Sequence, residues 1–110
     1  MRILLDECLD EELRHSFSSH DCQTCRYAGL RGLTNGKLIA AAEQLGFEVL
    51  LKSTVDQNIP YQQSLKGRRF SIVILRSRTT TLEDMLPLVP QVLTSLKFMQ
   101  PGDIVRIGLS

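Results

Sequence analysis

Three acidic side chains follow apolar runs of the sequence, where a buried strand would end. Asp6 and Glu7 come directly after residues 3–5, and Asp56 comes shortly after residues 47–51. Carboxylates that meet repel one another unless a cation neutralises them, so a meeting of Asp6 and Asp56 predicts a hard ion such as Mg²⁺ or Mn²⁺. Such an ion generates hydroxide from bound water and stabilises the charge that develops on a phosphodiester. The chemistry indicated is metal-dependent hydrolysis of a nucleic-acid backbone, with Glu7 as a further metal ligand.

Two amide side chains extend this set of oxygen donors. Asn35 stands before the second helical pattern, and Asn58 stands two residues after Asp56. We expect both to act as auxiliary ligands or to position a water molecule. A purely structural interpretation stays open, because Asp6 and Asp56 are also good helix N-caps and asparagine is common in turns.

Arg76 and Arg78 follow the most strand-like window of the chain, residues 70–75. They belong to a basic stretch without an intervening acid, whereas acids crowd the first dozen residues. We expect both guanidinium groups at the same sheet edge as Asp6, where they would bind phosphates beside the scissile bond. A solvated basic loop is the alternative interpretation.

The hydrophobic pattern predicts the elements that position these residues. Strands are predicted at residues 3–5, 20–26, 47–51, 70–75 and 104–107. Helices are predicted from 9 to 17, 38 to 45, 60 to 65 and 86 to 99, and the prolines at 87 and 90 confine the regular part of the last helix to its later turns. Thr81 with Asp84 indicates a helix N-cap, and Gly46 a helix end.

Strands that alternate with helices predict an α/β fold with a parallel sheet and helices on both faces. Ligands of such sheets bind beyond the carboxyl ends of the strands, where the strand order reverses. The 110 residues, 43% of them hydrophobic and 23% charged, predict a single domain spanning residues 1–110.

Charge and hydropathy indicate which partners and which compartment to expect. The formal net charge is +1, so any nucleic-acid binding depends on where charges are placed. No apolar stretch approaches the roughly 18 residues that cross a bilayer, and the start of the chain lacks a basic segment with a long apolar run. We therefore expect a cytoplasmic protein without a membrane partner.

The three cysteines do not indicate a disulfide framework or a zinc site. Cys22 and Cys25 are three residues apart, so on a strand their thiols would point to opposite faces of the sheet. No second cysteine pair or histidine pair completes a tetrahedral site. We interpret both as structural residues of a protein from a reducing compartment.

Four segments taken together resemble the small stand-alone PIN-like proteins of bacteria, a family treated as toxins of toxin-antitoxin pairs. They are residues 2–7, 29–36, 54–59 and 61–65, and the likeness extends over nearly the whole chain. The resemblance implies a PIN-like three-layer sandwich with a central, mostly parallel sheet, and Mg²⁺- or Mn²⁺-dependent cleavage of RNA. It also implies a cognate antitoxin protein as partner and a homodimer.

The resemblance carries over to particular positions. Asp6 matches the acid of the first strand and Asp56 the acid after the third. Asn35 and Asn58 stand where many relatives carry further acids, and residues 52–53 resemble an insertion before the usual Thr-x-Asp. Replacing two carboxylates by amides weakens metal affinity, and this motivates an alternative: a catalytically silent PIN-like module that binds a protein or RNA.

A third interpretation is a phosphoryl-accepting receiver domain. The acid pair after the first strand and Asp56 after the third have a spacing similar to that family. Receivers use a lysine after the fifth strand, whereas here Arg106 lies within the last predicted strand. The metal-dependent ribonuclease is the leading hypothesis.

Overall fold

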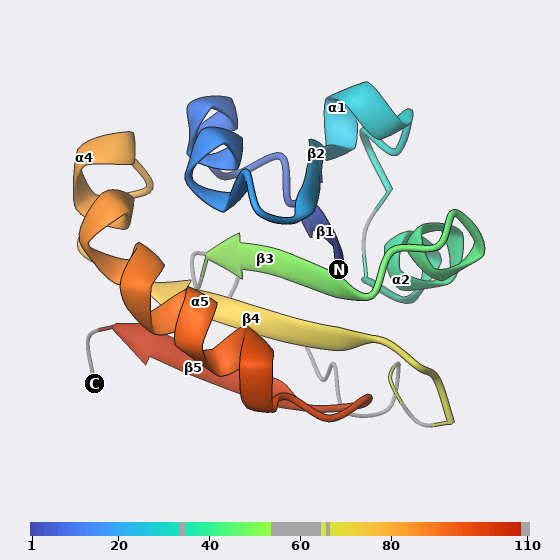
Figure 1. Cartoon of the computed structure of the whole chain (residues 1–110). Helices are drawn as coiled ribbons and strands as arrows, with labels where there is room; N and C mark the ends of the chain where they lie inside the picture. The colour runs from blue at the N-terminus through green and yellow to red at the C-terminus, as the bar shows by residue number, and fades with distance from the viewer. Residues whose placement is uncertain (34, 54–64, 66, 109–110) are drawn as a thin grey trace.

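The strands form one parallel sheet. The computed structural model describes residues 1–33, 35–53, 65 and 67–108 (Figure 1). The strands are β1 (Arg2–Leu5), β2 (Asp21–Thr24), β3 (Val49–Ser53), β4 (Ser71–Arg76) and β5 (Ile104–Gly108). They lie in the order β2-β1-β3-β4-β5, and every neighbouring pair is parallel. The predicted α/β class with a parallel sheet is confirmed.

The strand order reverses at β1. The chain passes outward from β1 to β2 and then returns to β3 on the other side of β1. In open parallel sheets such a reversal leaves a crevice beyond the carboxyl ends of the central strands. Leu5 pairs with Leu51, so β1 and β3 end side by side. The residues that follow these two strands therefore occupy the expected position of a ligand site.

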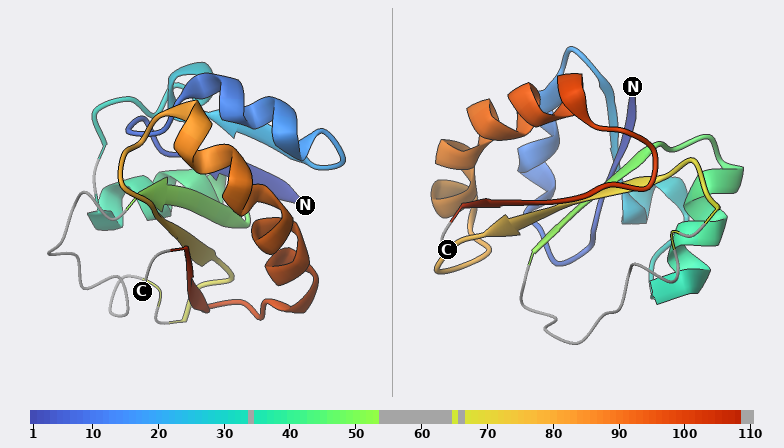
Figure 2. Two further views of the ribbon diagram at one scale, coloured as in Figure 1. Left: turned by 90° about the vertical axis from the view of Figure 1, so that its left-hand side faces the viewer. Right: turned by 90° about the horizontal axis from the view of Figure 1, so that it is seen from below.

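Helices cover both faces of the sheet (Figure 2). One face carries the 3-10 helix η1 (Glu11–Phe17), α4 (Leu82–Met85), the 3-10 helix η2 (Leu86–Leu88) and α5 (Val89–Phe98); the other carries α1 (Cys25–Ala28) and α2 (Asn35–Gln44). Because side chains alternate along a strand, Leu5 and Leu51 pack in one core, and Leu4 and Leu50 pack in the other. The three-layer arrangement predicted from the sequence is confirmed.

Side-chain caps decide where the short helices begin. Asp10 caps η1, because its Oδ1 accepts a hydrogen bond of 2.9 Å from the backbone N–H of Glu12. The predicted start at residue 9 is thus displaced, and the interpretation of Asp6 as the cap of this helix is wrong. Thr81 caps α4 by accepting from the backbone N–H of Asp84, as predicted.

The predicted strand at residues 20–26 is too long. It ends at Thr24, whose Oγ1 accepts a hydrogen bond of 3.0 Å from the backbone N–H of Tyr27 and so begins α1. Gly29 ends α1 with a φ of +77°, a conformation that suits glycine. This turn of helix sets the direction of the residues that follow β2.

Two further predictions concern the later part of the chain. The helix predicted at 86–99 is regular only from Val89, after Pro87, as the prolines require. The helix predicted at 60–65 lies outside the described residues, apart from Leu65. Within the described ranges, no helix combines the length and the apolar character needed to cross a bilayer.

Candidate functional site

Asp6 and Glu7 begin the segment that leaves β1. The backbone N–H of Asp6 donates a hydrogen bond of 2.9 Å to the carbonyl oxygen of Leu51, so the ladder between β1 and β3 continues up to Asp6. Asp6 is half-buried and Glu7 is exposed. Both residues line a cavity of about 420 Å³ at the carboxyl ends of β1 and β2. This cavity is lined by Asp6, Glu7, Glu11, Thr24, Cys25, Arg26 and Arg31.

Cys8 links the two central strand ends. Its thiol donates a hydrogen bond of 2.8 Å to Oδ2 of Asp6 and also interacts with the backbone of Ser53, the last residue of β3. Desolvation, together with the hydrogen bond and the charge of Asp6, raises the pKa of the Cys8 thiol to about 12. The charge of Lys52, a buried residue of β3, opposes this rise. Sequence reasoning missed this cluster.

Cys25 forms part of the wall of the cavity. Burial, followed by the charges of Asp6 and Glu7, raises the pKa of its thiol to about 12, and the backbone of Glu7 interacts with it. Cys25 lies in the core beneath α1 and α2, whereas Cys22 packs against the core on the opposite face. The prediction that these two thiols diverge is confirmed.

Two arginines that the sequence did not single out line the same cavity as the acids. Arg26 belongs to α1 and forms an ion pair of 3.4 Å with Glu11 across the entrance, with both side chains largely exposed. Arg31 is exposed and follows the buried Leu30. Among the described residues, Arg31 forms neither a hydrogen bond nor an ion pair. The cavity therefore combines carboxylates with guanidinium groups.

The predicted phosphate-binding pair occupies another part of the same sheet edge. Arg76 is the half-buried last residue of β4, and Arg78 is exposed two residues later. β4 lies two strands away from β1, a separation of about 10 Å. Both arginines lie at the carboxyl end of β4, as predicted, although Arg76 still belongs to the strand, and neither lines the cavity at Asp6.

The remaining predicted site residues are placed only in part. Asn35 is the first residue of α2, so this helix begins three residues before the predicted residue 38. Asp56 and Asn58 lie outside the described residues, so the meeting of Asp6 with Asp56 stays a prediction.

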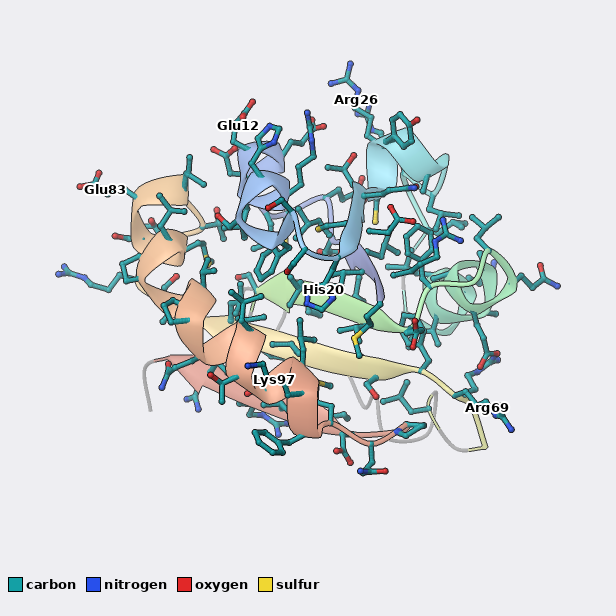
Figure 3. All side chains as sticks on the ribbon, in the orientation of Figure 1. Glu12, His20, Arg26, Arg69, Glu83 and Lys97 are labelled. Carbon is teal, nitrogen blue, oxygen red and sulfur yellow. The ribbon has the colours of Figure 1, made fainter. Side chains whose placement is uncertain are left out.

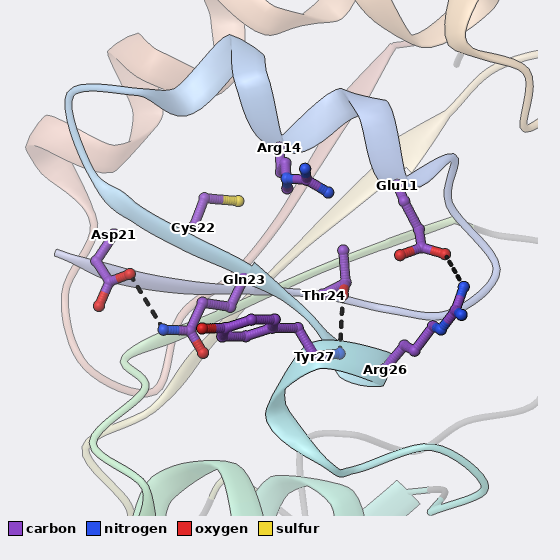
Figure 4. Close-up of a pocket in the computed structure, with 8 residues that line it drawn as sticks. All are labelled: Glu11, Arg14, Asp21, Cys22, Gln23, Thr24, Arg26 and Tyr27. Atoms are coloured by element: carbon purple, nitrogen blue, oxygen red, sulfur yellow. Dashed lines mark hydrogen bonds and ion pairs between the residues drawn. The ribbon is translucent and has the colours of Figure 1, made fainter.

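A second cavity adjoins the first. It has a volume of about 430 Å³ and lies between η1, β2 and α1 (Figure 4). Glu11, Thr24 and Arg26 line both cavities. Its other lining residues are Arg14, Asp21, Cys22, Gln23 and Tyr27.

The described residues supply part of the ligand set that a magnesium-type ion requires. Asp6 and Glu7 supply two carboxylates, and Mg²⁺ takes one or two carboxylates from proteins while keeping several waters. Across residues 1–33, 35–53, 65 and 67–108, no group of three or more His, Cys, Asp or Glu side chains is arranged to hold a metal.

Comparisons with protein-family models, with curated proteins and with solved structures find no match for this chain.

Proposed function

We propose that this protein is a metal-dependent ribonuclease of PIN-like type that acts as the toxin of a toxin-antitoxin pair. One observation carries the proposal: Asp6 and Glu7, at the reversal of the strand order, share a cavity with Arg26 and Arg31. Carboxylates suit a divalent cation, and guanidinium groups suit the phosphates of a polynucleotide. Together these groups match the needs of phosphodiester hydrolysis better than those of a site for an uncharged ligand.

Each residue has a proposed role. Asp6 and Glu7, with Asp56, hold Mg²⁺ or Mn²⁺, and that ion supplies an activated water and charge stabilisation at the phosphodiester. Asp56 follows Ser53 by three residues, a separation of at most about 11 Å in an extended chain, so it is within reach of the end of β1. Asn35 and Asn58 complete the catalytic set as auxiliary donors.

Arginine side chains fix the phosphates on either side of the reacting bond. Arg26 and Arg31 are placed for this role because they line the cavity at Asp6. Arg76 and Arg78 extend the basic surface along the same sheet edge beyond β4. A guanidinium group binds two phosphate oxygens at once, which orients the strand as well as attracting it.

RNA cleavage in the presence of Mn²⁺ tests the proposal. Asp6→Asn and Asp56→Asn should each abolish cleavage of a labelled RNA while leaving the melting temperature nearly unchanged. Glu83→Gln is a matched control, because Glu83 is an exposed acid on α4, far from the cavity (Figure 3). Full activity of either aspartate variant would reject the assignment. A wild-type protein that binds RNA without cutting it, whatever the cation, would establish the silent PIN-like module instead.

The strand order favours one further candidate, the phosphoryl-accepting receiver domain. The order β2-β1-β3-β4-β5 is the one found in receivers, and Asp6 and Glu7 lie where their metal-binding acids follow the first strand. The same order serves many unrelated functions, so the argument depends on the site. Arg106 lies within β5, where it does not replace the lysine after that strand. Transfer of phosphate from acetyl phosphate to Asp56 would decide for the receiver.

The partners and the compartment follow from the resemblance and are proposals too. RNA is the substrate, an antitoxin protein restrains the toxin in the cytoplasm, and a second copy of the chain forms a homodimer. Co-purification with the product of the adjacent gene tests the antitoxin, and persistent failure to associate would count against it. Analytical ultracentrifugation tests the homodimer.

A further inference from the structure

The two cavities beside β2 adjoin one another, and we refer to them together as the groove. The cavity at Asp6 and the cavity at Tyr27 share the side chains of Glu11, Thr24 and Arg26. Each has a volume of more than 400 Å³, so the groove has room for more than one nucleotide-sized group. It starts at the acids after β1, crosses the junction of β2 and α1, and ends beside the edge strand β2.

Cations lie along this groove. Arg31 lines the first cavity without an ion pair among the described residues, and Arg14 lines the second. Arg26 stands where the cavities join, and its pair with Glu11 is long, at 3.4 Å, and exposed. Exposed ion pairs of this kind are weak, so the Arg26 guanidinium can exchange Glu11 for a phosphate at little cost.

The loop that carries Arg31 is held on both sides. The backbone N–H of Leu30 donates a hydrogen bond of 2.8 Å to the carbonyl of Cys25, and the Leu30 side chain is buried in the core beside α2. Leu33 donates to the carbonyl of Leu30 in turn. Arg31 therefore projects from a fixed backbone, which reduces the entropy lost when its side chain binds a ligand.

Tyr27 supplies an aromatic surface at the far end of the groove. Its side chain is 80% exposed, although a ring of this size is usually at least partly covered. Figure 4 shows the ring projecting from α1 along the second cavity, next to Gln23. An exposed ring beside arginines is the arrangement on which unpaired bases stack in proteins that bind single-stranded nucleic acid.

We propose that this groove is a binding subsite for single-stranded RNA, in which Arg31 and Arg26 bind phosphates and Tyr27 stacks on a base at the end of the groove away from the scissile bond. The inference rests on the proposed nuclease function for the position of that bond. Binding itself depends only on the groove. Tyr27 should not increase the affinity for duplex RNA, because the bases of a duplex are already stacked on one another.

Binding of a labelled single-stranded RNA in EDTA, where no metal-dependent cleavage occurs, tests the subsite. Tyr27→Ala should weaken binding about 5- to 150-fold, which is the loss expected for one base–aromatic stack, whereas Tyr27→Phe should bind like the wild type. Arg31→Ala should weaken binding and reduce the slope of log affinity against log salt by about 0.7, the value for one phosphate contact on a single strand.

Two matched controls lie elsewhere on the surface. Phe98→Ala removes a ring that is 75% exposed at the end of α5, and Arg69→Ala removes an exposed guanidinium that precedes β4 (Figure 3). Neither should change RNA binding. Equal losses in Phe98→Ala and Tyr27→Ala, or unchanged binding in Tyr27→Ala and Arg31→Ala, would overturn the subsite.

The outcomes separate this inference from the nuclease proposal. RNA cleavage by the wild type with normal binding by the Tyr27 and Arg31 variants would retain the nuclease and reject the groove. Binding that depends on Tyr27 and Arg31, in a protein that never cleaves RNA, would retain the groove and reject the nuclease. Absence of any binding to single-stranded RNA would reject the groove directly.

Discussion

The thiol of Cys8 donates a hydrogen bond of 2.8 Å to Oδ2 of Asp6, the first acid after β1. One of the two carboxylate oxygens that a divalent ion would use is therefore already engaged by a neighbouring side chain. A cation that binds Asp6 through Oδ2 must displace this thiol or share the oxygen with it. Cys8 thus competes with the metal that the proposed function requires.

Removing this competition should strengthen metal binding. Cys8→Ala frees Oδ2 of Asp6. A hydrogen bond contributes about 0.5–1.5 kcal/mol net, so we expect the variant to bind Mn²⁺ about 2- to 10-fold more tightly. Isothermal titration calorimetry measures the change. Cys22→Ala is the matched control, because Cys22 lies on β2 and does not line the cavity at Asp6, so this variant should leave the affinity unchanged. Weaker Mn²⁺ binding by Cys8→Ala would show instead that the thiol supports the ligand arrangement.

Gly46 should tolerate a side chain less well than Gly67 does. Both have positive φ, +87° and +76°, so both alanine variants incur the cost of a left-handed backbone, about 1 kcal/mol or more. A Cβ at Gly46 would also lie 3.0 Å from Nη1 of Arg2, whereas a Cβ at Gly67 would meet no described residue within 4 Å. The guanidinium of Arg2 would have to move by a few tenths of an ångström, and it lies over the ring of Phe47, whose centre is 4.4 Å away. Urea unfolding should therefore show a larger loss for Gly46→Ala, and equal losses would argue against the contact with Arg2.

Alkaline pH should destabilise the fold through Cys22. Desolvation, followed by the charge of Asp21, raises the pKa of its thiol from 9.0 to about 12 in the folded protein. Above pH 9 the unfolded chain loses this proton while the folded chain keeps it. The contribution of this thiol to the free energy of unfolding is therefore constant below about pH 9. It falls as the pH rises towards 12, by up to about 1.4 kcal/mol per pH unit. The partial exposure of Cys22 places the real slope below that limit.

The comparison of wild type with Cys22→Ala isolates this contribution, because every other ionisable group is common to both. Urea unfolding between pH 8 and 11 should give a shallower decline for the variant. Identical slopes for the two proteins would show that the Cys22 thiol ionises in the folded state as readily as in the unfolded state.

The sequence predicted the strands well because their signals are local. Residues 47–51 and 70–75 are mostly apolar, residues 72–74 are β-branched, and β3 and β4 begin and end within two residues of the predicted bounds. The strand order could not be predicted, since it depends on which helices pack on which face over the whole chain. The reversal at β1, which explains why Asp6 is at a ligand position, came only from the structure.

The arginines of the site were missed for a related reason. Residues 20–26 were predicted to be one strand, and this prediction did not show to which side of the sheet the Arg26 side chain points. Thr24 ends that strand by capping α1, and Gly29 ends α1 three residues after Arg26. A threonine followed by a glycine five residues later was the available signal for a single helical turn. It indicates a turn and gives no indication that Arg26 and Arg31 face Asp6, because that depends on the neighbouring strand.

Glu11 should limit RNA binding without contributing to stability. Its Oε1 lies 3.4 Å from Nη1 of Arg26, and both side chains are largely exposed, so the ion pair contributes less than about 0.5 kcal/mol to folding. Glu11→Gln removes a negative charge that lines both cavities and releases Arg26 for a phosphate. We expect about 2- to 5-fold tighter binding of single-stranded RNA at low salt, with the difference shrinking as salt screens the charges. Glu12→Gln on the same helix is the control, since Glu12 pairs with His15 outside the groove. Equal gains in the two variants would mean that overall charge, and not the release of Arg26, governs binding.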